Sequence, residues 1–345
     1  MTVVAFARSA PARSSPPAPG ANPAAAQAPA APLSYLAHFG LAEAPFGLTP
    51  DTDYFFASPP HQEALNTLLY ALQNGEGFIR IVGAVGTGKT LLCRTLLASL
   101  PLDCHALYLP NPAIEPAGIL LAVADELGLE LPANESAHRV HKAIQTRLIE
   151  LARCGIRAVL IIDEAQAMSR DSLETVRLLS NLETEKRKLL AIVLLGQPEL
   201  DAQLDAIPQF KTRISFHDNL RPLTRAELDA YIAHRLQRAG CDARRGLPFS
   251  AGALGVLHAA SGGVPRVANI LAHKALLLAY GKGLASAGRR EMRAAARDTL
   301  AAQAPRRGRL WLLLLVAVLA GAAGMAAWHF GLAAHGPGRI AGLAA

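Results

Sequence analysis

Residues 83–90 combine the residue types that hold the phosphate groups of a nucleotide. They fit the pattern G-x-x-x-x-G-K-[ST], which ends in Lys89 and Thr90, and they follow an apolar run at residues 78–82 that is typical of a strand. The glycines let successive backbone N–H groups face the phosphates, and a helix beginning near Lys89 adds the positive end of its dipole. Lys89 is predicted to reach the β- and γ-phosphates and Thr90 to bind Mg²⁺. The alternative interpretation is a glycine-rich turn without a ligand.

A pair of acids, Asp163 and Glu164, follows a second apolar run at residues 158–162. That run shows no alternation of polar and apolar residues, as expected for a central parallel strand buried on both faces. Open α/β sheets bind their ligands at the carboxyl ends of such strands. Asp163 is therefore predicted to bind Mg²⁺ through water, and Glu164 to polarise a water that attacks the γ-phosphorus. The alternative is an acidic pair at the N-terminus of the next helix.

Strands and helices alternate regularly through the first two thirds of the chain. Strands are expected at residues 78–82, 105–109, 158–162 and 189–195, and helices at 90–100, 114–127, 136–152 and 172–182. This βαβ series predicts a parallel sheet with right-handed crossovers. Gln197 follows the last of these strands, where it could contact the γ-phosphate or the attacking water; an ordinary turn residue is an equally good interpretation.

Beyond residue 221 the pattern changes to helices alone. Thr224 and Glu227 form a capping box that opens one helix, Ser250 opens another, and residues 261–265 break the chain before a helix that begins at Arg266. A parallel nucleotide-binding core followed by a small helical lid is the layout of AAA+ ATPases. The expected fold is therefore α/β, a P-loop sheet with an all-α lid.

Composition limits the class of protein. The chain has 345 residues, 51% of them apolar and 18% charged, which is enough for two packed domains with appendages. Its 4 cysteines are scattered without a C-x-x-C pair. This spacing favours reduced thiols in the cytoplasm and argues against a zinc site or a disulfide scaffold.

The two ends of the chain differ from the middle. Residues 1–33 are rich in Ala and Pro and are expected to be disordered. Residues 310–330 begin with an uncharged apolar run bounded by Trp311 and Trp328, which predicts a transmembrane helix. Arginines on its N-terminal side place the preceding domain in the cytoplasm by the positive-inside rule. Most of the net charge of +7 falls between residues 289 and 309, where it suits anionic lipid headgroups; nucleic acid is the competing partner.

Several blocks of sequence together resemble the ExeA/MshM group of AAA+ ATPases. The blocks are residues 35–41, 45–46, 49–51, 61–65, 83–90, 178–184, 195–200, 220–223 and 262–266. The resemblance covers about residues 34–282. It implies a bacterial inner-membrane ATPase that supports type II secretion or type IV pilus assembly, closest to the MshM-like branch and MSHA-type pilus biogenesis. It also implies ATP and Mg²⁺ as ligands, a homo-oligomer in a ring or head-to-tail array, and secretion or pilus assembly proteins as partners.

The resemblance further nominates two arginines. Arg213 lies at the position of a trans-acting finger, which would reach the γ-phosphate bound by a neighbouring subunit. Arg266 matches the second sensor, which contacts nucleotide from the lid of the same subunit. The alternative for Arg213 is a surface arginine that pairs with Asp218 or nearby carboxylates. The alternative for Arg266 is an arginine that starts a helix and is exposed to solvent. His61 begins a helix before the phosphate-loop strand, where a plain capping role is as good an interpretation as a place near the adenine ring.

The expected site combines catalytic, nucleotide-binding and metal-binding residues, and the expected chain has six parts. The expected catalytic residues are Lys89, Glu164, Gln197 and Arg213; the nucleotide-binding residues are Gly83, Ala84, Val85, Gly86, Thr87, Gly88, Lys89, Thr90, Leu91, Asp163 and Arg266; the metal ligands are Thr90 and Asp163. The expected domains are the disordered extension 1–33, the P-loop core 34–221, the helical lid 222–284, a basic juxtamembrane helix or linker 285–309, the transmembrane helix 310–330 and a short periplasmic tail 331–345.

Three functions remain open at this stage. The first is a single-pass, membrane-anchored ATPase machine with its ATPase domain in the cytoplasm. The second is a DNA-handling AAA+ protein of the transposition-regulator type, whose basic segment would contact phosphates with strong salt dependence. The third is a scaffold that binds ATP as a switch; the intact Asp163–Glu164 pair argues against it.

Overall fold

The computed structural model describes residues 35–132, 135–184, 187–242, 246–299 and 325. The expected extension 1–33, the periplasmic tail 331–345 and, apart from Met325, the expected span 310–330 lie outside these residues. Within the described ranges, no helix has the length and apolar character that crossing a bilayer requires.

A single parallel sheet forms the centre of the first domain. It has 5 strands in the order β2-β3-β4-β1-β5, and every neighbouring pair is parallel. The strands are β1 (Phe78–Gly83), β2 (Cys104–Leu109), β3 (Arg157–Ile162), β4 (Leu190–Gly196) and β5 (Phe216–Leu220). The expected parallel sheet is confirmed. Because β4 lies between β1 and β3, the phosphate loop and the acidic pair emerge on either side of the end of β4.

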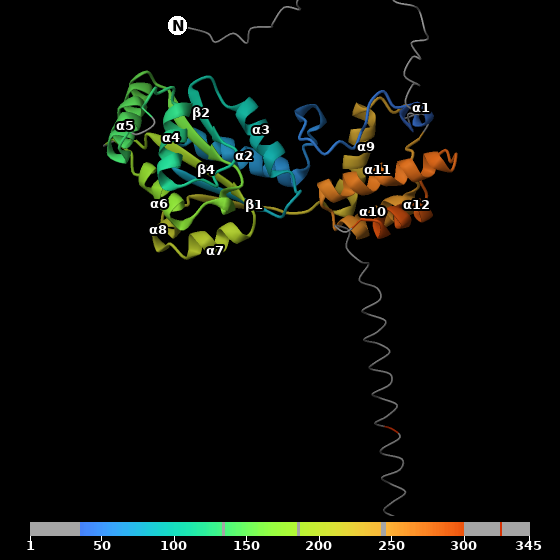
Figure 1. Cartoon of the computed structure of the whole chain (residues 1–345). Coiled ribbons are helices and arrows are strands. Elements are labelled where there is room, and N and C mark those ends of the chain that lie inside the picture. Colours follow the sequence, from blue (N-terminus) through green and yellow to red (C-terminus); the bar gives the residue numbers. More distant parts are fainter. Residues whose placement is uncertain (1–34, 133–134, 185–186, 243–245, 300–324, 326–345) are drawn as a thin grey trace, which may run out of the picture. The chain divides into compact units, whose positions relative to one another are not determined.

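Both faces of the sheet are covered by helices (Figure 1). In β3, Leu160 and Ile162 join the hydrophobic core on one face, and Val159 and Ile161 join the core on the other. The first face is covered by α4 (Pro116–Glu126), α5 (Ala137–Arg153) and α6 (Arg170–Leu179), and the second by α2 (Pro59–Gln73) and α3 (Lys89–Ser99). Burial on two sides explains why the strand shows no polar alternation.

Four short elements of the core were not expected from the sequence. They are the 3₁₀ helix η2 (Ala165–Ala167), α7 (Glu199–Asp205), α8 (Pro208–Lys211) and strand β5. β5 pairs with β1 at the edge of the sheet, and its His217 and Asn219 are exposed. An edge strand with polar side chains lacks the apolar run by which the other strands are recognised.

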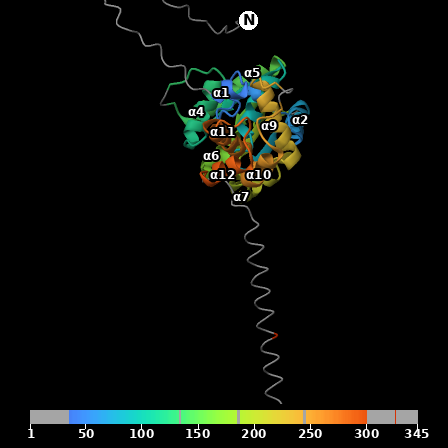
Figure 2. The same cartoon turned by 90° about the vertical axis from the view of Figure 1, so that its right-hand side faces the viewer.

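The second domain is a bundle of α9 (Arg225–Arg238), α10 (Ala251–Ser261), α11 (Pro265–Gly281) and α12 (Arg289–Arg297), which lie side by side in both views (Figures 1 and 2). The capping box of Thr224 and Glu227 is confirmed at the start of α9. Helix α12 packs against α10 and α11 and buries Met292 and Ala295. The lid therefore continues past residue 284, its expected end, because the arginine-rich segment has an apolar face that the bundle covers.

The chain before the core belongs to the same hydrophobic core as the lid. This segment contains α1 (Tyr35–Phe39) and the 3₁₀ helix η1 (Thr52–Tyr54). Tyr35, Phe46 and Tyr54 are buried with the lid helices. Residues 35–54 thus pack on the lid, because their aromatic side chains complete the apolar surface of α9 and α11. From the sequence, these residues were expected to belong to the P-loop core.

Candidate functional site

The phosphate loop joins the end of β1 at Gly83 to the start of α3 at Lys89. The Lys89 side chain is buried, and its Nζ donates to the carbonyl oxygens of Gly83 at 2.7 Å and Ala84 at 3.1 Å. Burial lowers the pKa of Lys89, while the neighbouring Glu164 and Asp163 act in the opposite direction. The ammonium group is thus held over the loop beside two carboxylates, at the N-terminus of a helix whose first N–H groups have no intrahelical partner.

Two glycines in the loop cannot be replaced without displacing a neighbour. Gly86 has φ 81° and Gly88 has φ 103°, both in the left-handed region that side chains disfavour. A Cβ atom on Gly86 would lie 2.7 Å from Cβ of Arg266, and one on Gly88 would lie 2.6 Å from Nε2 of His61. The loop is therefore packed between the lid helix α11 and the core helix α2.

Asp163 lies at the end of β3, where the sequence placed it. Its side chain is buried, and Oδ1 accepts the backbone N–H of Glu164 at 2.9 Å. Burial raises the pKa of Asp163, whereas hydrogen bonds from the Thr90 hydroxyl and the Glu164 N–H oppose that rise. The structure thus brings Thr90 and Asp163 into contact, as the predicted metal site requires.

Glu164 adopts an unusual backbone conformation next to this carboxylate. With φ 52°, it is the one non-glycine residue with positive φ among those described. Its Oε2 accepts hydrogen bonds from Gln166 Nε2 at 2.6 Å and from Gln197 Nε2 at 3.2 Å. Gln197 follows β4, beside β3, as expected.

Gln166 was missed by the sequence interpretation. Its Nε2 donates to Glu164, and its Oε1 accepts the backbone N–H of Gln197 at 2.9 Å. One carboxamide thus links the ends of two adjacent strands. No pattern marks this residue in the sequence, because its role depends on β3 and β4 being neighbours in the sheet.

One cleft collects most of the predicted nucleotide-binding residues. Of that set, Val85, Gly86, Gly88, Lys89, Thr90, Leu91 and Arg266 line the cleft, and so does the predicted catalytic residue Glu164. The remaining wall comes from residues 47–51 and from Tyr54, Tyr231, Arg235, Pro265 and Asn269. The cleft is therefore bounded by the phosphate loop, the lid and the segment before the core.

The lid wall contains a buried arginine that sequence reasoning did not select. Arg235 Nη1 donates to the Tyr231 hydroxyl at 2.9 Å, and that hydroxyl donates to Asn269 Oδ1 at 3.0 Å. The guanidinium also lies 4.8 Å from the centroid of the Tyr54 ring. No sequence pattern marks this cluster, because Tyr54 comes from the segment before the core and Asn269 comes from α11.

Arg266 lies at the start of α11, as expected, and is exposed at the cleft. Its backbone N–H donates to the carbonyl oxygen of Gly86 at 3.2 Å. The lid helix thus contacts the phosphate loop directly through its first turn.

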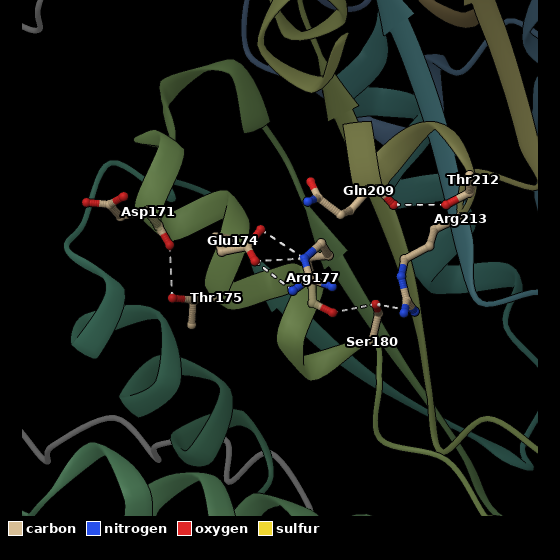
Figure 3. Close-up of polar contacts among 8 residues, drawn as sticks. All are labelled: Asp171, Glu174, Thr175, Arg177, Ser180, Gln209, Thr212 and Arg213. Atoms are coloured by element: carbon tan, nitrogen blue, oxygen red, sulfur yellow. Dashed lines mark hydrogen bonds and ion pairs between the residues drawn. The ribbon is translucent and has the colours of Figure 1, made fainter. Parts of the chain in front are cut away.

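Arg213 does not line the cleft of its own chain. It lies just after α8, and its Nη1 is 3.5 Å from Ser180 Oγ at the end of α6 (Figure 3). The alternative partner Asp218 instead accepts the backbone N–H of Asn219. The structure therefore separates Arg213 from Lys89, Glu164 and Arg266.

Comparisons with known proteins agree with this geometry. Residues 72–204 match a family model described as an AAA domain. The chain is 40% identical over 251 residues to General secretion pathway protein A of Aeromonas hydrophila; the match covers 72% of this chain and 45% of that protein, so the chain spans less than half of the relative.

Solved structures share the fold at low sequence identity. Cdc6p from Pyrobaculum aerophilum is 19% identical with a TM-score of 0.56, covering 73% of this chain and 72% of that one. The Aeropyrum pernix ORC2 protein, in ADPNP and ADP complexes, is 17% identical with a TM-score of 0.54, covering 75% and 74%. The match of residues 72–204 to the AAA domain model and the 40% identity to General secretion pathway protein A show that the chain belongs to the AAA+ ATPases.

Proposed function

We propose that this ATPase binds and hydrolyses ATP in the cleft between its phosphate loop and lid, and uses the cycle to drive or regulate assembly of a cell-envelope apparatus. The observation that carries the proposal is that Lys89, Thr90, Glu164 and Arg266 line one cleft although they come from three separate segments of the chain. Phosphate-binding, acidic and lid groups meet there, as phosphoryl transfer to water requires.

The donor set of Thr90 and Asp163 fits Mg²⁺. A hydroxyl and a carboxylate are hard oxygen ligands, and Mg²⁺ commonly takes one or two protein ligands together with phosphate oxygens and water. When bound, the ion would neutralise charge that develops on the phosphate groups. Asp163 is buried and hydrogen-bonded to Thr90, so the two predicted ligands already lie side by side before an ion binds.

The chain's own groups divide the remaining work. Lys89 holds the β- and γ-phosphates, and the loop N–H groups surround them. Glu164 accepts a proton from, or orients, the attacking water, while Gln166 and Gln197 hold its carboxylate in place. Arg266 contacts the nucleotide from the lid, so that hydrolysis changes the contact between α11 and the loop.

The role of Arg213 requires a second copy of the chain. Its position outside its own cleft supports action on a neighbour's γ-phosphate, as a trans-acting finger. A head-to-tail array of subunits would then place each Arg213 beside the next Glu164.

The envelope role rests on the secretion relative and on the sequence. General secretion pathway protein A is named for secretion, and residues 310–330 have the composition of a membrane span. We therefore assign the protein to type II secretion or MSHA-like type IV pilus biogenesis at the bacterial inner membrane, in the MshM-like branch. Its partners would be secretion or pilus assembly proteins.

Two variants of the full-length protein test the cleft. Lys89→Ala removes the phosphate-binding amine, so ATP affinity should fall at least about tenfold. Glu164→Gln keeps the shape of the side chain but removes its basicity, so ATP should still bind while turnover falls by about 10² or more. Binding is measured by calorimetry and turnover by phosphate release.

An exposed acid outside the cleft serves as the control. Glu130→Gln should leave affinity and turnover unchanged, because Glu130 is distant from the loop in sequence and does not line the cleft. Normal ATP affinity in Lys89→Ala, or undiminished hydrolysis in Glu164→Gln, would remove the respective residue from its assigned role.

A further inference from the structure

A buried histidine connects helix α2 to the phosphate loop. The side chain of His61 is 6% exposed. Its Nε2 lies 2.9 Å from the carbonyl oxygen of Thr87, and its Nδ1 lies 2.6 Å from Ser58 Oγ. Both ring nitrogens therefore have a partner, and one of those partners is the backbone of the loop itself.

These partners determine the tautomer of the ring. A carbonyl oxygen only accepts hydrogen bonds, so Nε2 must carry the hydrogen that is donated to Thr87. In a neutral imidazole Nδ1 is then an acceptor, and the Ser58 hydroxyl donates to it. Burial lowers the pKa of His61, which favours this neutral form.

The start of α2 frees Ser58 for this contact. Ser58 occupies the N-cap position, where a serine commonly caps the helix, but its side chain makes no capping hydrogen bond. The next two residues, Pro59 and Pro60, have no backbone N–H to be capped. Its hydroxyl instead contacts the ring of His61.

The bond to Thr87 has a consequence for the other end of the same peptide unit. All described peptide bonds are trans, and a trans peptide is planar, with its C=O and N–H pointing in opposite directions. Holding the Thr87 carbonyl toward His61 therefore directs the Gly88 N–H away from His61. Gly88 lines the cleft, whereas Thr87 is buried and is not part of its lining.

We propose that His61 is a positioning residue of the ATP site: its Nε2–H holds the Thr87 carbonyl so that the Gly88 N–H faces the phosphate chain of the nucleotide. The proposal rests on the ATP site proposed above. His61 touches no substrate atom and acts only through the orientation of the loop. Because the Gly88 N–H would contact phosphate in the ground state as well as during transfer, losing its orientation should weaken binding more than turnover.

The test compares full-length His61→Gln, His61→Asn and His61→Phe with wild type in steady-state ATP hydrolysis. The Gln side chain can place an amide N–H near the position of Nε2, whereas Asn is one methylene shorter and Phe has no donor. KM for ATP should rise about tenfold in the Asn and Phe variants, with kcat within about twofold, and should return close to wild type in the Gln variant. Exposed Gln62→Ala, on the same helix, should match wild type.

Several outcomes would overturn the proposal. These are an unchanged KM in His61→Asn, a fall in kcat without a rise in KM, or a Gln variant as impaired as the Asn variant. Because Asn and Gln are similarly polar and small, their comparison holds even where the Phe variant fails to fold. Lys89→Ala is measured alongside: if it binds ATP normally, the proposed ATP site has failed, and that result differs from a failure of His61 alone.

Discussion

At the scale of single residues, the acid predicted to activate water is held in a strained conformation. A non-glycine residue at the φ of 52° seen for Glu164 costs about 1–2 kcal/mol. The strain is offset by hydrogen bonds that the carboxylate accepts from Gln166 and Gln197. These bonds fix the direction of the carboxylate, which a flexible side chain at a strand end would not otherwise keep.

Gln166→Ala should therefore reduce turnover more than binding. The variant removes the donor to Glu164 Oε2 and the acceptor for the Gln197 N–H, so the carboxylate loses its orientation. We expect kcat to fall about tenfold with KM changed by less than about twofold. The control is Gln209→Ala, because Gln209 is exposed and does not line the cleft. A rise in KM without loss of kcat would contradict the orienting role.

At the scale of elements, a charged pair closes the joint between the core and the lid. Arg221, just after β5, donates through Nη1 and Nη2 to the two carboxylate oxygens of Glu227, each at 2.8 Å. Glu227 also accepts the backbone N–H of Thr224 at 2.7 Å as part of the capping box of α9. The Arg221 hydrogen bond is the main reason that the pKa of Glu227 falls to about 2.

The lowered pKa gives the joint a pH dependence. A carboxyl group whose pKa is depressed by folding stabilises the fold fully above its unfolded pKa, near 4.5, and loses that contribution as the pH falls toward about 2. Glu227→Gln keeps a capping side chain but loses the charge, so Tm at pH 7 should fall by about 2–4 °C. The difference in Tm between the variant and wild type should shrink between pH 5 and pH 3, as measured by thermal melts in buffers of matched ionic strength. A difference in Tm that stays constant over this range would show that the variant is destabilised by altered packing and not by the lost charge.

The lid also shows how an element can be misjudged from charge alone. The arginines of α12 are exposed, yet Met292 and Ala295 on its other face are buried against α10 and α11. A helix with one basic and one apolar face is equally suited to a bundle and to a membrane surface. The helical lid was predicted, but the packing of α12 into it was not, because that packing depends on contacts with α10 and α11.

At the scale of the whole molecule, the position of Arg213 predicts dependence on neighbouring subunits. A mixture of Arg213→Ala and Glu164→Gln subunits contains interfaces that pair an intact acid with an intact finger. If each variant alone is inactive, random mixing should restore about a quarter of wild-type turnover through these interfaces. Equal amounts of the two variants are mixed and phosphate release is followed. No recovery in assemblies shown to be mixed would favour a role within one subunit or a structural role.

The proposed anchor separates the two main functional hypotheses. Full-length protein should sediment with membranes and resist extraction by high salt, whereas a version that ends at Pro305 should remain in the supernatant, because it lacks residues 310–330. Fractionation with detection of ATPase activity measures this. If the full-length protein stayed in the supernatant and bound DNA with steep salt dependence, the DNA-handling alternative would replace the envelope role.

The sequence by itself determined the parts whose chemistry is local. The phosphate loop, the acidic pair after a buried strand and the capping box of α9 each depend on a few consecutive residues, and so do the regular helices and strands. These could be predicted because residue type and periodicity specify short-range geometry. The AAA+ class followed from the order of those elements.

Only the tertiary structure decided which distant segments meet. Gln166 bonds with Gln197 because β4 lies beside β3, and Arg235 stacks near Tyr54 because residues 35–54 pack on the lid. His61 contacts the loop because α2 packs on one face of the sheet beside β1, and the loop follows the end of β1. Such contacts leave no periodic mark, because each joins residues whose separation along the chain is set by topology and not by the repeat of a helix or strand.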